Sequence, residues 1–262
     1  MKAGLKLWST NFTNYFQEAL SLYERGLYSY IELYVVPDSL VFIDDWKKLK
    51  IPFTIHCPHS AHGFNLAKSE LRRHNQSLFE EVRKYADRLS ADYIVIHGGL
   101  DGTVEETARQ LKALNEPRAL IENKPYRSVP GVIKDVKVCV GNNLEELQLI
   151  KEESGCGFCL DFGHAVCASN SYKKDCFDYI GELMTLKPQM FHLTDITDMK
   201  SDIDAHPHLG HGYLDLKRIG QYLPEDAKVT LETVKQSKTS LNDFIEDANI
   251  FKDLKKQERK TI

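Results

Sequence analysis

The alternation of short apolar runs with amphipathic stretches is the feature that most constrains how this 262-residue chain can fold. Eight runs rich in β-branched and aromatic residues are expected to form strands. They are Leu5 to Trp8, Tyr30 to Val36, Phe53 to Cys57, Tyr93 to His97, Ala119 to Asn123, Phe158 to Asp161, Met190 to Thr194 and Val229 to Thr233. Helical spacing is clearest at Tyr15 to Arg25, Ser69 to Leu89, Val104 to Asn115, Leu144 to Glu153, Tyr172 to Met184 and Leu241 to Lys256.

Strands that alternate with helices form parallel sheets through right-handed crossovers, and eight such units in about 250 residues predict an α/β chain folded as a closed (β/α)8 TIM barrel. A doubly wound open sheet is the rival, but no G-x-G-x-x-G motif follows the first strand to support it. No linker, low-complexity segment or tandem repeat interrupts the chain, so residues 1–262 are expected to form one domain. Two loops are long, 124–141 and 196–214, and long loops in compact domains are commonly functional.

The overall charge narrows the partners only slightly. A formal net charge of −4 provides no global basic field for nucleic acid, although an acidic protein can still carry a local basic groove. No stretch is long and apolar enough for a transmembrane helix, and the N-terminus lacks the apolar run of a signal peptide. Six scattered cysteines fit free thiols in a reducing compartment. We therefore expect a cytoplasmic protein with no membrane partner; the oligomeric state is not indicated.

Ligand-type residues follow six consecutive predicted strands, in the motifs I-H-C-P-H, I-V-I-H-G-G, L-I-E-N-K-P, C-L-D-F-G-H, F-H-L-T-D and T-L-E-T. In a barrel these strand ends surround one mouth, where barrel enzymes carry their chemistry. A single histidine there is more often a hydrogen-bonded structural residue. Carboxylates inside apolar strands, as at Glu122, Asp161 and Glu232, instead require a cation because burial of an unpaired charge is costly. Their convergence predicts a divalent metal site.

The mixture of imidazole and carboxylate ligands suits Zn²⁺, with Mn²⁺, Fe²⁺ or Co²⁺ as alternatives, better than Ca²⁺ or Mg²⁺, which prefer oxygen. The number of ligand-type residues is sufficient for more than one ion. Sites with several metals are typical of enzymes that transfer or hydrolyse phosphoryl groups.

The motifs P-H-S-A-H-G-F-N-L, I-H-G-G, I-E-N, C-L-D-F-G-H, H-L-T-D and D-A-H-P-H-L-G-H-G resemble those of the endonuclease IV-like and xylose isomerase-like TIM barrels, over nearly the whole chain. Bacterial endonuclease IV, which cuts DNA at abasic sites, is similar in all of them. The resemblance implies up to three zinc ions held by nine ligands. They are His59 and His97 on the first metal, Glu122 bridging to the second, Asp161, His192 and Glu232 on the second, and His164, Asp204 and His206 on the third.

Related sugar isomerases and epimerases need one metal, held by residues that match Glu122, Asp161, His192 and Glu232. These four residues therefore do not separate the two functions. The additional residues His59, His97, Asp204 and His206 do, and they favour a hydrolase with several metals. The resemblance thus predicts a metal-dependent phosphoester hydrolase with Glu122 and Glu232 as its catalytic residues.

Departures from endonuclease IV concern the parts that would contact DNA. His62 stands where that family has an aromatic residue that probes DNA, the first strand ends in L-W-S-T-N-F, and Lys124 replaces a threonine. The substrate is therefore expected to be a phosphoester, with abasic-site DNA as one candidate. Lys124, together with His208 and His211 outside the nine, is a candidate substrate contact.

Two other functions remain open at this stage. In the first, a sugar or sugar phosphate is isomerised or epimerised with one metal, and Glu122 and Glu232 exchange a proton at the carbon beside a carbonyl. Glu32 in Y-I-E-L would then orient the substrate or pair with a cation inside the barrel. In the second, the barrel has lost catalysis and serves as a binding protein, which the retention of every ligand type disfavours.

Overall fold

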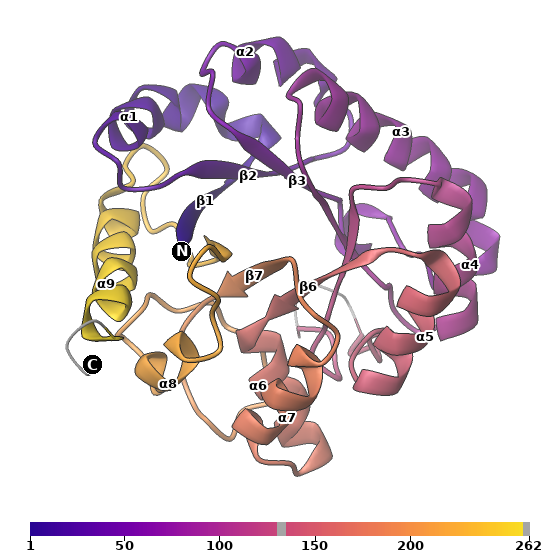
Figure 1. Ribbon diagram of the computed structural model, residues 1–262. Helices are drawn as coiled ribbons and strands as arrows, with labels where there is room; N and C mark the ends of the chain where they lie inside the picture. The colour runs from indigo at the N-terminus through magenta and orange to yellow at the C-terminus, as the bar shows by residue number, and fades with distance from the viewer. Residues whose placement is uncertain (130–134, 259–262) are drawn as a thin grey trace.

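The computed structural model describes residues 1–129 and 135–258, with side chains described up to residue 254. Eight parallel strands close into a barrel in chain order, with the first strand paired to both the second and the eighth. The larger helices surround it (Figure 1). This architecture confirms the predicted TIM barrel. Residues 130–134 of the predicted long loop after the fifth strand lie outside the described residues.

Each predicted apolar run overlaps one strand, although the bounds differ by a few residues. The strands are β1 (Lys2–Trp8), β2 (Tyr30–Tyr34), β3 (Phe53–His56), β4 (Ile94–His97), β5 (Ala119–Glu122), β6 (Gly157–Asp161), β7 (Met190–Leu193) and β8 (Lys228–Leu231). The α-helices are α1 (Phe12–Glu24), α2 (Ile43–Lys47), α3 (Arg72–Arg88), α4 (Val104–Leu114), α5 (Leu144–Ser154), α6 (Phe162–Tyr172), α7 (Cys176–Met184), α8 (Leu216–Gly220) and α9 (Asn242–Glu258). Short 3-10 turns occur at η1 (Ser9–Asn11), η2 (Leu40–Phe42), η3 (Ser60–His62) and η4 (Ser69–Leu71).

The predicted helix Tyr172 to Met184 is wrong at its start. The structure has two helices here, α6 ending at Tyr172 and α7 beginning at Cys176. Residues 162–169 of α6 are all buried, so no polar face marks the helical period in the sequence. The helix begins because Asp161 Oδ1 accepts a hydrogen bond of 2.7 Å from the backbone N–H of His164, as an N-cap residue does.

The strands divide their side chains between two cores, because neighbouring residues of a strand point to opposite faces. Residues such as Ile31, Ile94 and Ile121 belong to the main core, which also contains the buried faces of the helices. The alternate residues Tyr30, Val95, Leu120, Cys159 and Met190 form a separate buried cluster, which we call the floor of the barrel. A Cβ at Gly4 would fall on the Tyr30 ring, so the bare backbone of β1 leaves the room that this large side chain fills.

In the described part of the chain, no helix combines the length and the apolar character that a membrane crossing requires.

Candidate metal centre

A ring of polar side chains lies directly above the floor of the barrel. It contains Lys6, Glu32, His56, His97, Glu122, Asp161, His192 and Glu232, so every strand supplies one member within two residues of its carboxyl end. Five of these residues stand two positions beyond a floor residue, on the same face of the strand. The register of the barrel places His97 beside Glu122 and Asp161 beside His192. Sequence reasoning missed Lys6 and His56, which the two-residue period of β1 and β3 could have indicated.

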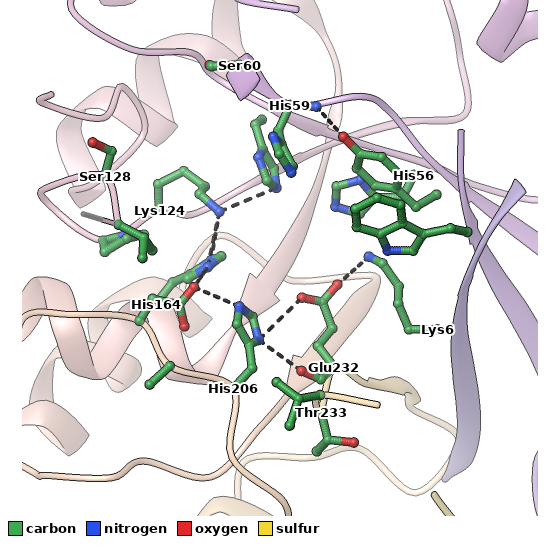
Figure 2. A pocket seen from close by; sticks show the side chains of 18 of the residues that line it. Lys6, His56, His59, Ser60, Lys124, Ser128, His164, His206, Glu232 and Thr233 are labelled. Carbon is green, nitrogen blue, oxygen red and sulfur yellow. Dashed lines mark hydrogen bonds and ion pairs between the residues drawn. The ribbon is translucent and has the colours of Figure 1, made fainter. Parts of the chain in front are cut away.

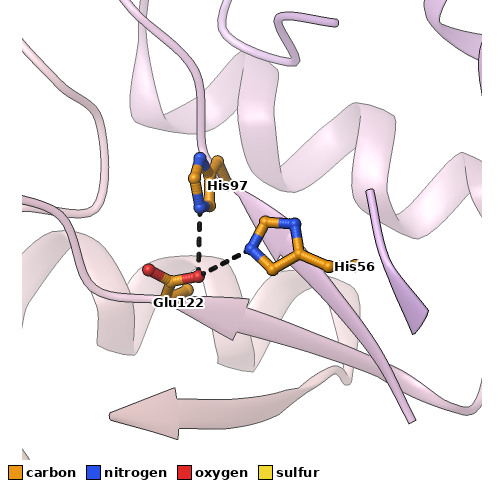
Figure 3. A group of neighbouring side chains, drawn as sticks. All are labelled: His56, His97 and Glu122. Atoms are coloured by element: carbon orange, nitrogen blue, oxygen red, sulfur yellow. Dashed lines mark hydrogen bonds and ion pairs between the residues drawn. The ribbon is translucent and has the colours of Figure 1, made fainter. Parts of the chain in front are cut away.

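Glu122 lies at the centre of a group of imidazoles. Its side chain is fully buried, and its Oε2 lies 3.0 Å from His97 Nε2 and 3.3 Å from His56 Nε2 (Figure 3). Its other carboxylate oxygen lies 2.9 Å from His164 Nδ1. Burial on its own would raise the pKa of Glu122, but the charges of His97 and Lys124 hold it well below its usual range. Glu122 is therefore a charged carboxylate with ligand-type groups on both oxygens.

His192 is oriented by a carboxylate on a distant strand. Its Nε2 lies 2.9 Å from Glu32 Oε2, which leaves Nδ1 facing the mouth. That nitrogen lies 3.2 Å from Glu232 Oε1, 3.6 Å from Glu122 Oε2 and 3.8 Å from Asp161 Oδ2. An imidazole that donates one N–H to a carboxylate and turns its other nitrogen toward several carboxylates has the arrangement of a metal ligand with an outer hydrogen-bond partner.

Lys6 is a resident cation of the ring. Its ammonium pairs with both Glu32 and Glu232, and Glu32 also accepts a hydrogen bond of 2.5 Å from Thr230. Burial would lower the pKa of Lys6, but the charges of Glu232 and Glu32 raise it above its ordinary value. Of the two roles considered for Glu32, pairing with a cation inside the barrel is the one that the structure supports.

His164, Asp204 and His206 form a second group at the mouth. Asp204 Oδ2 lies 3.0 Å from His164 Nε2 and 2.8 Å from His206 Nε2. Burial would lower the pKa of both histidines. The charges of Asp161 and Asp204 raise the pKa of His164 to about 10, and the charge of Asp204 raises that of His206 to about 9. Without a bound cation, both imidazole rings are therefore positively charged beside Asp204.

The loop that carries Asp204 and His206 is held by Asp195, at the end of the seventh predicted strand motif. The Asp195 carboxylate accepts hydrogen bonds of 2.7 to 3.1 Å from four backbone N–H groups, those of Ile196, Gly210, Gly212 and Leu214. Because these donors come from both ends of the predicted 196–214 loop, the side chain closes the loop over the mouth. The last residue of H-L-T-D is thus a structural clamp.

A cavity of about 590 Å³ opens above the ring, and Figure 2 shows its polar wall. Lys124 reaches into it, with Nζ 3.1 Å from His164 Nε2, 3.4 Å from His97 Nε2 and 3.5 Å from Glu122 Oε1. Trp8 lines the rim with 43% of its surface exposed. The predicted substrate contact Lys124 therefore lies in the cavity, between the Glu122 group and the Asp204 group.

Unsatisfied polar atoms indicate that this centre fits metal ions. Within the described part of the chain, Glu122 Oε1, Asp161 Oδ2, His192 Nδ1 and Asp204 Oδ1 are buried and make no hydrogen bond of normal geometry, although Glu122 Oε1 lies 2.9 Å from His164 Nδ1 and His192 Nδ1 lies 3.2 Å from Glu232 Oε1. Such atoms are rare in folded proteins unless a water or an ion satisfies them. The ligand atoms also fall into compact sets whose members lie within 4.8 Å of one another, including Asp161 with His192 and Glu232, and His164 with Asp204 and His206. Nitrogen and carboxylate donors in this mixture suit Zn²⁺ and similar ions.

The structure brings together eight of the nine predicted ligands, all except His59. Among the described residues, His59 belongs to no compact set, and His56 instead stands with His97 and Glu122. Of the remaining candidate substrate contacts, His208 lies in a buried pair with Asp247, 2.9 Å from Nδ1 to Oδ2. His211 is exposed beside it. Neither is among the described residues that line the cavity.

Comparison with known proteins agrees with the barrel fold. The pattern of the xylose isomerase-like TIM barrel family matches residues 41–254. The chain belongs to this family. It is 27% identical over 184 residues to the probable endonuclease 4 of Thermoplasma volcanium, and the match covers 67% of this chain and 64% of the relative. The match thus spans less than two thirds of the relative's length.

Two solved structures illustrate the range of the xylose isomerase-like family. A D-tagatose 3-epimerase-like protein superposes with a TM-score of 0.75 and 16% identity, covering 99% of both chains. Endonuclease IV from Thermus thermophilus superposes with a TM-score of 0.69 and 18% identity, covering 98% of this chain and 100% of that one. At such identities the likeness supports the fold alone, so the reaction has to be argued from the side chains at the mouth.

Proposed function

We propose that this protein is a metal-dependent phosphoester hydrolase whose site lies at the carboxyl-end mouth of the barrel. The observation that carries the proposal is the assembled group of His164, Asp204 and His206, with Asp204 Oδ2 within 3.0 Å of both imidazoles. A sugar isomerase with one metal has no need of this group, since Glu122, Asp161, His192 and Glu232 suffice there. The 27% identity with a probable endonuclease 4 supports the same choice.

The proposed ligands form three neighbouring sets around Glu122. One contains His97 and Glu122, a second contains Glu122, Asp161, His192 and Glu232, and the third contains His164, Asp204 and His206. When bound there, Zn²⁺ or a similar ion supplies positive charge for a phosphoryl group and activates water for attack. The ninth predicted ligand, His59, lines the cavity, and its ring centroid lies 6.1 Å from that of His97.

The protein's own side chains supply binding and orientation. Glu122 lies between the sets, because His97 and His164 approach different oxygens of its carboxylate. Its negative charge would offset the positive charge of the ions on either side. Glu232 forms an ion pair with Lys6, and its Oε1 lies 3.2 Å from His192 Nδ1. Lys124 lies in the cavity as a cation on a long, flexible side chain that can contact a phosphate oxygen of the substrate.

The test combines metal content with cleavage. Elemental analysis of the purified protein is expected to give more than one ion per chain. A duplex with one abasic site is expected to be nicked, or a simple phosphodiester hydrolysed, and Asp204→Asn is expected to lower that rate at least tenfold. One ion per chain together with no cleavage of either substrate would contradict the proposal.

A second candidate, epimerisation or isomerisation of a sugar or sugar phosphate, is favoured by the size of the cavity and by one residue of its lining. Its volume of about 590 Å³ is that of a small-molecule pocket, and the exposed face of Trp8 at its rim suits the apolar face of a sugar ring. Glu122 and Glu232 would then exchange the proton. Solvent deuterium entering a ketose, retained in Asp204→Asn but lost in Glu232→Gln, would identify this reaction; no exchange with any ketose would exclude it from consideration.

A further inference from the structure

One lysine of the cavity lacks the carboxylate partners that the others have. Three lysines line the described part of the cavity, and two lie beside carboxylates: Lys6 forms ion pairs above the floor, and Lys124 Nζ lies 3.5 Å from Glu122 Oε1. The third, Lys235, has no carboxylate within 4.0 Å among the described residues. Its Nζ donates to the carbonyl oxygen of Thr233 at 2.9 Å, which leaves two of its three N–H groups for another acceptor.

We propose that Lys235 and Asn11 form an anion subsite, which binds a second, non-reacting phosphate of a small phosphorylated substrate. This inference rests on the proposed function, because it takes the metal centre as the place of the reaction. It adds that the substrate carries two negative groups, one at the metal centre and one at the end of the cavity between β1 and β8.

The charge of Lys235 is only partly compensated by the protein. Burial lowers the pKa of Lys235, and the charges of Asp243 and Asp247, which act in the opposite direction, do not restore it. Both carboxylates accept hydrogen bonds from other backbone and side-chain donors. The ring of Phe244, with its centroid 5.8 Å from Nζ, adds a weak cation–π contact. An anion that enters the cavity would therefore stabilise the ammonium.

Asn11 adds a second donor at the same end of the cavity. Its Oδ1 accepts a hydrogen bond of 2.9 Å from the backbone N–H of Trp8, which assigns the amide and leaves Nδ2 as a donor. Because β1 and β8 are paired neighbours, the segments that follow them bring Asn11 and Lys235 to one end of the cavity. The acidic residues of the described lining, Asp204 and Glu232, both belong to the metal centre. Donors without a carboxylate of their own favour an anion.

The segment that carries Lys235 is fixed on both sides of this residue. The Val234 N–H donates to the His206 carbonyl oxygen at 3.1 Å, and the Tyr15 hydroxyl donates to the Ser237 carbonyl oxygen at 2.6 Å. Since Tyr15 belongs to α1, the loop after β8 is tied to the helix that follows β1. The backbone of the subsite is thus held in place without a ligand, which lowers the entropy cost of binding.

The place of the subsite indicates the class of substrate. Figure 2 shows Lys124 and Thr233 on opposite sides of His206, and Lys235 is bonded to the backbone of Thr233. A substrate that contacts both lysines therefore spans the metal centre. The flanking phosphate of a nucleic acid strand has the same chemistry, but a cavity of about 590 Å³ has the size of a small-molecule pocket. The second phosphate is thus assigned to a small molecule such as a sugar bisphosphate.

The test compares two sugars that differ by one phosphate, fructose 1,6-bisphosphate and fructose 6-phosphate, in calorimetric binding to the zinc-loaded protein. The wild type is expected to bind the bisphosphate about tenfold more tightly than the monophosphate. Lys235→Met is expected to remove this difference, and Lys235→Arg to retain most of it. Lys238→Met, at an exposed position of the same segment, is the matched control and should keep the full difference.

Asn11→Asp provides a second variant of the same subsite. It keeps an oxygen that accepts the Trp8 N–H, but it replaces the Nδ2 donor with a negatively charged oxygen. Binding of the bisphosphate is expected to weaken more than binding of the monophosphate. Circular dichroism of each variant checks folding.

A preference for the bisphosphate that survives Lys235→Met, or that is lost equally in Lys238→Met, would overturn the subsite and leave the hydrolase standing. A preference that depends on Lys235 in a protein that cleaves no phosphoester would support the subsite and overturn the hydrolase. Weaker binding of an abasic-site duplex in Lys235→Met, with no effect on either sugar, would overturn the assignment of the second phosphate to a small molecule.

Discussion

The carboxylate of Asp195 lies where a side chain at position 212 would stand, so that Gly212 and Asp195 fit against each other only because the glycine has no Cβ. The same carboxylate binds the Gly212 N–H at 3.1 Å and the Gly210 N–H at 2.8 Å. This contact fixes the loop that carries Asp204 and His206. The third ligand set therefore depends on a residue that would not bind metal itself.

Asp195→Ala is expected to destabilise the protein and to disorder this set. Four backbone donors lose their acceptor. Two of these hydrogen bonds, from Ile196 and Leu214, are buried, and since each unsatisfied buried donor costs about 1–3 kcal/mol, a loss of roughly 3 kcal/mol or more in the free energy of unfolding is expected. Denaturant unfolding and metal content per chain measure the two effects. Asp198→Ala, at an exposed position of the same loop, is the control and should change neither. Equal unfolding free energies and equal metal contents in the two variants would contradict the role of Asp195 in holding the loop.

Lys6→Met is expected to destabilise the metal-free protein by about 3–5 kcal/mol, because it leaves Glu32 and Glu232 without their shared ammonium. The double variant Lys6→Met with Glu32→Gln should recover part of this loss, since it removes the charge of Glu32 as well. Chemical denaturation after chelation measures both. Lys2→Met, at an exposed site on the same strand, is the control. If the double variant is less stable than the sum of the single variants predicts, Lys6 does not act through Glu32.

Much of this centre could be predicted because charged residues within or just after apolar runs are recognisable in the sequence. Glu122, Asp161 and Glu232 are carboxylates within apolar runs, and the barrel gathers such positions at one mouth. The prediction for His59 came from a motif resemblance. His56, which stands with His97 and Glu122 in the structure, is identified only by the direction in which its side chain leaves β3.

Other features depend on contacts between distant segments. Lys6 reads in the sequence as one charge in an amphipathic strand, and its partner Glu232 is 226 residues away. Asp195 resembles one more strand-end ligand until its four backbone donors are seen. Helix α6 escaped prediction because burial on all sides removed the polar face that marks a helical period. Such features follow from packing, which local patterns do not encode.

Glu106→Gln is expected to flatten the acid side of the stability curve. Hydrogen bonds from Arg72, opposed by burial and reinforced by Gln110, lower the pKa of Glu106 from 4.5 to about 2. A carboxyl whose pKa is lower in the folded state stabilises it above its unfolded pKa. That stability is lost as the pH falls from about 4.5 toward 2. Unfolding free energies measured between pH 2 and 7 should therefore vary less in the variant, whereas exposed Glu105→Gln keeps the wild-type slope. Parallel curves for Glu106→Gln and the wild type would contradict this role.

Lys124→Met is expected to tighten metal binding while weakening phosphoester turnover. Lys124 Nζ lies 3.1 Å from His164 Nε2 and 3.5 Å from Glu122 Oε1, between two proposed ligand sets. Two unit positive charges about 4 Å apart repel by about 4 kcal/mol at an effective dielectric constant of 20, so a bound ion must displace the ammonium toward the cavity. Removing the ammonium removes that repulsion, and the dissociation constant measured by chelator competition should fall at least tenfold.

The same substitution should lower the rate of phosphoester cleavage, because the displaced ammonium is the group available to contact the substrate. Lys137→Met is a suitable control, since Lys137 follows the same strand and pairs with Asp101 at 3.0 Å, away from the ligand sets. Metal binding that weakens in Lys124→Met would mean that the lysine supports the ions and does not compete with them. Tighter binding with unchanged turnover would keep the competition and remove Lys124 from the substrate contacts.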